Sequence, residues 1–111
     1  MRSWDLRTID APDGTRDPVV LDTKDDARAV LVALSPGQKL GDHQVKERAW
    51  LVVVDGTVEI SAGGETNTWG VGTLAMFEPN ERHAVRSEDG ARILMLLAPW
   101  PGHGHFHPGE R

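Results

Sequence analysis

The chain has 111 residues, of which 39% are hydrophobic and 26% are charged, values that suit one soluble globular domain rather than a disordered chain. Its formal net charge of −5 disfavours nucleic acid and anionic membrane surfaces as partners. Because cysteine is absent, disulfides, thiolate metal ligands and a cysteine nucleophile are all excluded.

Residues 1–14 contain no apolar run of signal-peptide length. No apolar run elsewhere approaches the roughly 20 residues that a helix needs to cross a bilayer. We therefore expect a cytoplasmic protein that binds neither nucleic acid nor membrane.

From residue 18 onward, short apolar stretches alternate with turn residues, and no sustained helical stripe is present. The best helical segment, residues 24–34, soon becomes a run of β-branched residues typical of a strand. The candidate strands are residues 18–23, 27–35, 49–54, 57–62, 65–70, 73–79, 82–87 and 91–99. This spacing predicts about eight to ten strands in an all-β barrel or sandwich.

Pairs of turn residues separate several of these strands. Asp55-Gly56 and Asp89-Gly90 predict type I′ hairpins, in which both central residues have positive φ. Gly63-Gly64 predicts a further turn.

Two stretches of the chain resemble the metal-binding motifs of the cupin family. In the first, Gly37 is followed by five residues and then His43, and Gly56 lies where the family motif closes. The second runs from Gly72 through a proline-containing turn to His83, with the spacing of the family. Both motifs occur in the family's order.

The resemblance covers residues 27–99 and implies a double-stranded β-helix, or jelly-roll barrel, with a site inside its open end. We expect N-terminal strands that could serve as a dimer arm in residues 1–26, the cupin barrel in 27–99 and a flexible tail in 100–111. Because members of the family commonly pair, a homodimer is expected. Trp50 is expected on the outside of the barrel or in a subunit interface.

The first family motif supplies two histidines and a glutamate, and the second supplies one more histidine. When the motif glycines are aligned, His43 takes the first histidine position, and Val45 and Ala49 replace the second histidine and the glutamate. His83 keeps the histidine of the second motif. This alignment leaves two of the four family ligands.

An alignment shifted by two residues gives a larger ligand set, because His43 then takes the second histidine position and Glu47 the glutamate position. If one strand runs through residues 43–53 without a bulge, alternation places His43 and Glu47 on one face. With His83 they imply a site for a divalent ion such as iron, manganese, nickel or zinc. The segment around Glu47 is also consistent with a solvated charged turn.

Two functions remain open from the sequence. The resemblance implies a metal-dependent oxygenase, isomerase or lyase acting on a small molecule, whose anionic group Arg48 or Arg82 would suit. The replaced ligands favour instead a non-catalytic module that binds a small ligand without metal. The sequence specifies neither the catalytic residues nor whether the protein is an enzyme.

The C-terminal tail carries His103, His105 and His107 in alternation. Alternating imidazoles can bind a divalent metal, but ordering a flexible tail costs conformational entropy. We therefore expect a solvated tail.

Overall fold

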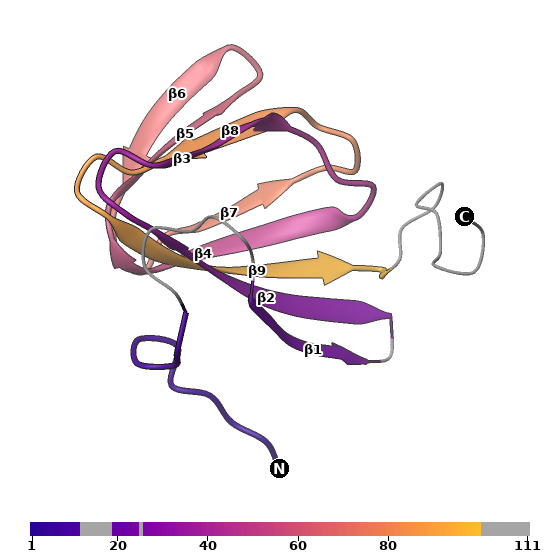
Figure 1. Cartoon of the computed structure of the whole chain (residues 1–111). Coiled ribbons are helices and arrows are strands. Elements are labelled where there is room, and N and C mark those ends of the chain that lie inside the picture. The colour runs from indigo at the N-terminus through magenta and orange to yellow at the C-terminus, as the bar shows by residue number, and fades with distance from the viewer. Residues whose placement is uncertain (12–18, 25, 101–111) are drawn as a thin grey trace.

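The computed structural model in Figure 1 describes residues 1–11, 19–24 and 26–100, apart from the side chains of residues 24 and 41–43. Antiparallel strands dominate this part of the chain. In chain order they are β1 (Val19–Lys24), β2 (Ala27–Leu34), β3 (Lys39–His43), β4 (Arg48–Gly56), β5 (Val58–Ala62), β6 (Glu65–Trp69), β7 (Leu74–Phe77), β8 (His83–Arg86) and β9 (Ala91–Ala98).

The strands form two sheets that face each other (Figure 1). One sheet has the order β1-β2-β9-β4-β7, and the other has the order β3-β8-β5-β6. The predicted all-β architecture is confirmed, and the helical segment considered at residues 24–34 instead contributes β2. The described part of the chain contains no helix long and apolar enough to span a membrane.

Alternation of side chains along the strands builds the core between the two sheets. In β4, Ala49, Leu51 and Val53 are buried, whereas the residues between them are only partly covered. The alternate residues of β9, from Ala91 to Leu97, face them across the β4–β9 ladder. This is the two-residue period that a strand with one buried face requires.

Both Asp-Gly pairs lie at corners where the chain passes from one sheet to the other, so the two predicted hairpins are wrong. β4 pairs with β7 and β9, whereas β5 pairs with β6 and β8. Only the glycine of each pair has positive φ, +79° at Gly56 and +98° at Gly90, although a type I′ turn needs two such residues. The apolar faces of β4 and β5 lie in opposite layers, where each packs against the other sheet.

The turn at Gly63-Gly64 is a tight hairpin. It joins β5 to β6, with Ala62 directly opposite Glu65. Its φ values of +61° and +81° fit a type I′ turn, which only glycine and a few polar residues adopt readily.

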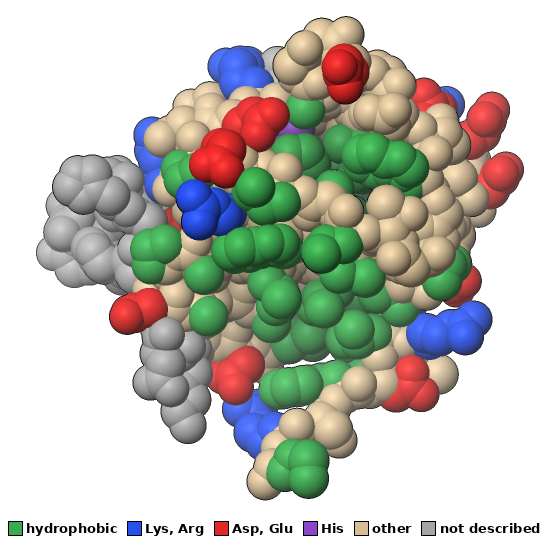
Figure 2. All heavy atoms as spheres, turned by 180° about the vertical axis from the view of Figure 1, so that it is seen from behind, with side chains coloured by type: hydrophobic (Ala, Val, Ile, Leu, Met, Phe, Trp, Pro, Cys, Tyr) green, Lys and Arg blue, Asp and Glu red, His purple; other side chains and the backbone are tan. Residues whose placement is uncertain are grey.

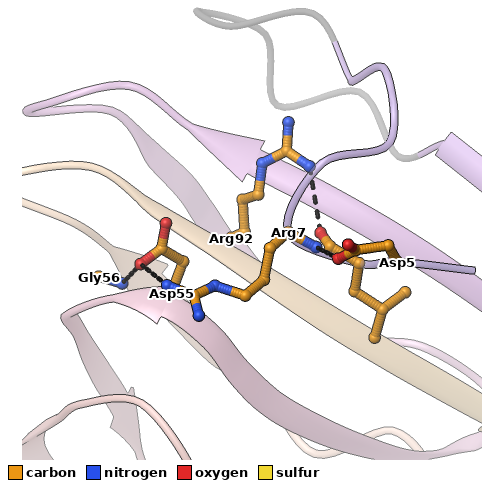
Figure 3. A network of polar contacts seen from close by, with 6 residues as sticks. Asp5, Arg7, Asp55, Gly56 and Arg92 are labelled. Atoms are coloured by element: carbon orange, nitrogen blue, oxygen red, sulfur yellow. Dashed lines mark hydrogen bonds and ion pairs between the residues drawn. The ribbon is translucent and has the colours of Figure 1, made fainter.

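The N-terminal segment covers one half of the outer face of the five-stranded sheet. Leu6 and Ile9 pack against a small apolar cluster that contains Leu31 of β2. The guanidinium of Arg92 donates hydrogen bonds to the carbonyls of Leu6 and Ile9, at 3.1 and 2.9 Å. Arg7 lies 3.9 Å from Asp55, so the same segment also meets the end of β4 (Figure 3).

The other half of this outer face, over β9, β4 and β7, is apolar and partly or fully exposed. Leu74, Met76 and Leu96 expose 61%, 45% and 40% of their surface. The register places them beside Trp50 and residues 52 and 94 on neighbouring strands. A broad apolar area is visible on the face shown in Figure 2. We call these six residues the apolar face: Trp50, Val52, Leu74, Met76, Leu94 and Leu96.

Candidate functional site

His83 begins β8 and lies on the inner face of the four-stranded sheet. It stands opposite Ala62 of β5 and is only 1% exposed. Its Nδ1 is 3.0 Å from the carbonyl oxygen of Glu81. Because a carbonyl can only accept, Nδ1 carries the proton and Nε2 of the neutral ring carries the lone pair. Metal-binding histidines are commonly oriented by this kind of contact.

Phe77, at the end of β7, fixes the plane of the His83 ring. The two rings are stacked with centroids 4.0 Å apart and an angle of 5° between their planes. Phe77 is itself buried, at 4% exposure, and its register partner is Ala49 in β4. Two strands from opposite sheets therefore hold the imidazole in place.

Glu47 is completely buried, with 0% exposure. It directly precedes β4 and shares the parity of the inward residues Ala49 and Leu51. Its segment is held by a 2.7 Å hydrogen bond from the Asn80 amide to the Val45 carbonyl, which joins it to the loop before His83. A solvated turn is therefore the wrong description of Glu47, although Lys46 beside it is exposed.

The expected continuous strand through residues 43–53 does not exist. β3 ends at His43 in one sheet, and β4 begins at Arg48 in the other. The ladder of β3 also shifts register between Leu40 and His43. The burial of Glu47 thus follows from the crossing between sheets and not from the alternation assumed for a single strand.

The backbone of His43 lies opposite His83 in the β3–β8 ladder, although the two are 40 positions apart. The side chain of His43 lies outside what the structure describes, as do His103, His105 and His107 of the tail. Among the described side chains, no group of three acidic, histidine or cysteine residues could hold a metal ion. Glu47 and His83 are the two described members of the predicted ligand set.

A pocket of about 260 Å³ opens between β6 and β7, an edge strand of each sheet. Its wall includes Phe77, Ala62 and Glu81, each of which contacts or pairs with His83. His83 is not among the described residues that line the pocket, whereas Phe77 both lines it and stacks on the His83 ring. The remaining lining residues are Ile60, Glu65, Asn67, Trp69, Ala75 and Met76.

Sequence reasoning missed the polar wall of this pocket. Glu65 and Asn67 of β6 pair with Ala62 and Ile60 and therefore share their inner face. The sequence did contain one indication of it. Glu65, Asn67 and Trp69 occupy alternate positions and so lie on one face of the strand, with two polar residues followed by an apolar one. An edge strand whose inward positions are polar indicates a hydrated interior rather than a packed core.

The two arginines expected near an anionic substrate do not line the pocket. Arg48 lies 3.4 Å from the Glu78 carboxylate, with its guanidinium 5.9 Å from the centroid of the Trp50 ring. Arg82 is exposed. A larger hollow of about 340 Å³ is lined by the corner residues around Asp55 and Asp89, and its described lining includes no member of the predicted ligand set.

Solved structures share this fold at low sequence identity. An uncharacterized conserved protein with a double-stranded β-helix domain from Klebsiella pneumoniae has a TM-score of 0.79 and 18% identity, over 92% of this chain and 93% of its own. A structural-genomics protein of unknown function from Rhizobium leguminosarum has a TM-score of 0.74 and 22% identity, over 89% and 97%. A cupin superfamily protein from Desulfitobacterium hafniense has a TM-score of 0.73 and 13% identity, over 81% and 83%.

The search among curated proteins gives no match. The family model described as Cupin domain matches residues 30–99, which include β3 to β9, Glu47 and His83. With this match over more than half of its length, the chain belongs to the cupin family.

Proposed function

We propose that this cupin binds a divalent metal ion inside its barrel through His43, Glu47 and His83, and receives a small molecule in the pocket beside them. The observation that carries the proposal is the nearly complete burial of Glu47 and His83, at 0% and 1% exposure, beside the apolar core. A cation stabilises a buried carboxylate, and a metal ion held jointly by Glu47 and His83 would supply that charge. The Glu81 carbonyl also selects the tautomer whose Nε2, a fully buried atom, suits a metal ion.

His43 completes the set through its register. The backbone of His43 stands opposite that of His83 in the ladder of β3 and β8, which brings the two residues together although they are far apart along the chain. Two imidazoles and one carboxylate suit iron(II), manganese, nickel or zinc. Such an ion, when bound, would supply Lewis acidity or oxygen chemistry, and the sequence and fold select no particular reaction.

The proposal is tested by the metal content of tag-free protein purified without chelators. We expect about one metal ion per chain in the parent, and a loss of affinity of at least about tenfold in Glu47→Gln and in His83→Gln. His43→Ala should behave in the same way. Glu81→Gln is the matched control, because its backbone carbonyl still orients His83.

The tail is tested separately by replacing His103, His105 and His107 together with alanine. This variant should retain the metal. A parent free of metal after reconstitution with each of the four ions would contradict the proposal and favour the ligand-binding module without metal. Loss of metal only in the tail variant would also contradict it. Thermal unfolding of each variant distinguishes lost ligands from lost folding.

We also propose that the apolar face pairs two copies of the chain. Contiguous apolar patches beyond a few hundred Å² are uncommon on monomers, and this one lies on the half of the sheet that the N-terminal segment leaves uncovered. The six residues of the apolar face are uncharged, so two copies related by a two-fold axis would bring apolar side chains against apolar side chains. Sheet faces of this kind pack well against each other.

The dimer is tested by light scattering coupled to size exclusion. We expect a dimeric parent, and monomers for Leu96→Glu and Met76→Glu, because each would bury a charge in the interface. Val20→Glu is the control. Val20 is 46% exposed and does not belong to the apolar face or to the apolar cluster beneath the N-terminal segment, which contains its neighbours Val19 and Leu21. A monomeric parent at micromolar concentration, or dimers of both face variants, would contradict the proposal.

A further inference from the structure

The pocket between β6 and β7 combines negative charge with aromatic surface. Its lining contains the carboxylates of Glu65 and Glu81 and the amide of Asn67, with Trp69 and Phe77 as aromatic walls. Among the described residues that line it there is no lysine or arginine. An anionic ligand would therefore meet like charge, whereas a cation would meet two carboxylates.

The polar groups of the pocket have unused hydrogen-bonding capacity. Within the described part of the chain, no side-chain hydrogen bond or ion pair engages Glu65 or Asn67, and both are exposed to solvent. Glu81 is more fixed, because one of its carboxylate oxygens accepts a 2.9 Å hydrogen bond from the Glu78 amide. The second carboxylate oxygen of Glu81, which lies in the loop before His83, is a further acceptor at the pocket.

We infer that this pocket binds a small organic cation, such as a primary alkylammonium ion. The carboxylates and the Asn67 carbonyl would accept its N–H groups, and the faces of Trp69 and Phe77 would contact its alkyl part or its charge. The described lining offers two carboxylates and no histidine, together with aromatic and aliphatic surface, so an organic cation matches it better than a metal ion does. The inference rests on the part of the proposed function that makes this pocket a ligand site. It does not depend on a bound metal ion.

The volume limits the size of the ligand. At about 260 Å³ the pocket is smaller than the roughly 300–1,000 Å³ typical of sites for drug-sized molecules. It therefore suits a short amine rather than a polyamine or a nucleotide.

Three probes of nearly equal size and different charge test the inference: butylammonium, 1-butanol and butyrate. Binding is measured by titration of the backbone amide resonances of the parent protein at low ionic strength. We expect butylammonium to shift the resonances of β6, β7 and the loop around Glu81 in a saturable way. We expect 1-butanol to bind more weakly and butyrate to cause no saturable shift there.

Charge-neutral variants of the pocket locate the interaction. Glu65→Gln and Glu81→Gln should each weaken butylammonium binding about threefold, and the double variant about tenfold, because each removes one screened charge interaction. Glu59→Gln is the matched control. It removes the same charge from β5, but Glu59 pairs with Arg86 across the ladder and does not line the pocket. Its affinity should match that of the parent.

The inference is overturned if butyrate binds as tightly as butylammonium, if no probe binds at accessible concentrations, or if Glu59→Gln weakens binding as much as the pocket variants. Failure here is distinguishable from failure of the metal site. Glu65→Gln and Glu81→Gln should leave the metal content unchanged, whereas Glu47→Gln should change it without abolishing the butylammonium shifts.

Discussion

Gly56→Ala is expected to destabilise the fold by about 3 kcal/mol or more, a large share of the roughly 5–15 kcal/mol that holds a typical domain folded. A Cβ on Gly56 would lie 2.1 Å from the Gly90 carbonyl oxygen and 2.8 Å from Cα of Ala91. These are backbone atoms of the adjacent strand, so they cannot rotate away as the end of a side chain could. Equilibrium unfolding in urea, followed by tryptophan fluorescence, measures the change.

Gly37→Ala is the matched control for the backbone conformation. Gly37 has a φ of +80°, almost the same as the +79° of Gly56, but an added Cβ would meet no atom within 4 Å. Its amide, which donates to the carbonyls of Ser87 and Glu88, is retained in the variant. We expect a loss of only about 1 kcal/mol, the cost of positive φ for a residue with a side chain. If the two variants lose the same free energy of unfolding, the backbone around Gly56 can move to accommodate a Cβ, and the prediction for Gly56→Ala is wrong.

Phe77→Ala is expected to lower the free energy of unfolding by about 3–5 kcal/mol. It should also open a connection between the pocket and His83. The ring of Phe77 is in contact with both, because it is stacked at 4.0 Å on the imidazole and also lines the pocket. Its removal should expose the His83 ring to reagents in the pocket. Modification by diethyl pyrocarbonate, read by peptide mass spectrometry, should rise strongly at His83.

Two further variants separate opening of the pocket from general destabilisation. Phe77→Leu keeps much of the volume, so modification of His83 should rise only slightly. Ile93→Ala makes a cavity in the fully buried core of β9, away from the pocket, and should lower stability without exposing His83. If His83 reacts equally in the parent and in Phe77→Ala, or equally in Phe77→Ala and Ile93→Ala, Phe77 does not separate it from the pocket.

The candidate site could be predicted only in part. His83 and Glu47 could be chosen from the sequence because the second motif and the shifted alignment point to them. Their burial, at 1% and 0%, depends on a loop that crosses between sheets and on the Phe77 ring above the imidazole. The pocket residues Glu65 and Asn67 carried too little signal, because polar residues in an edge strand are equally expected on a solvated face.

By itself, the sequence determined the all-β class, most strand positions and the cupin resemblance. Those properties are local, since a strand with one buried face repeats its apolar residues every two positions whatever its neighbours are. Only the tertiary structure decided that the Asp-Gly pairs are corners, that residues 43 and 48 lie in different sheets, and that a pocket remains between β6 and β7. Strand pairing is set by contacts between residues far apart along the chain, and the alternation within one strand does not reveal which partner or layer will bury it.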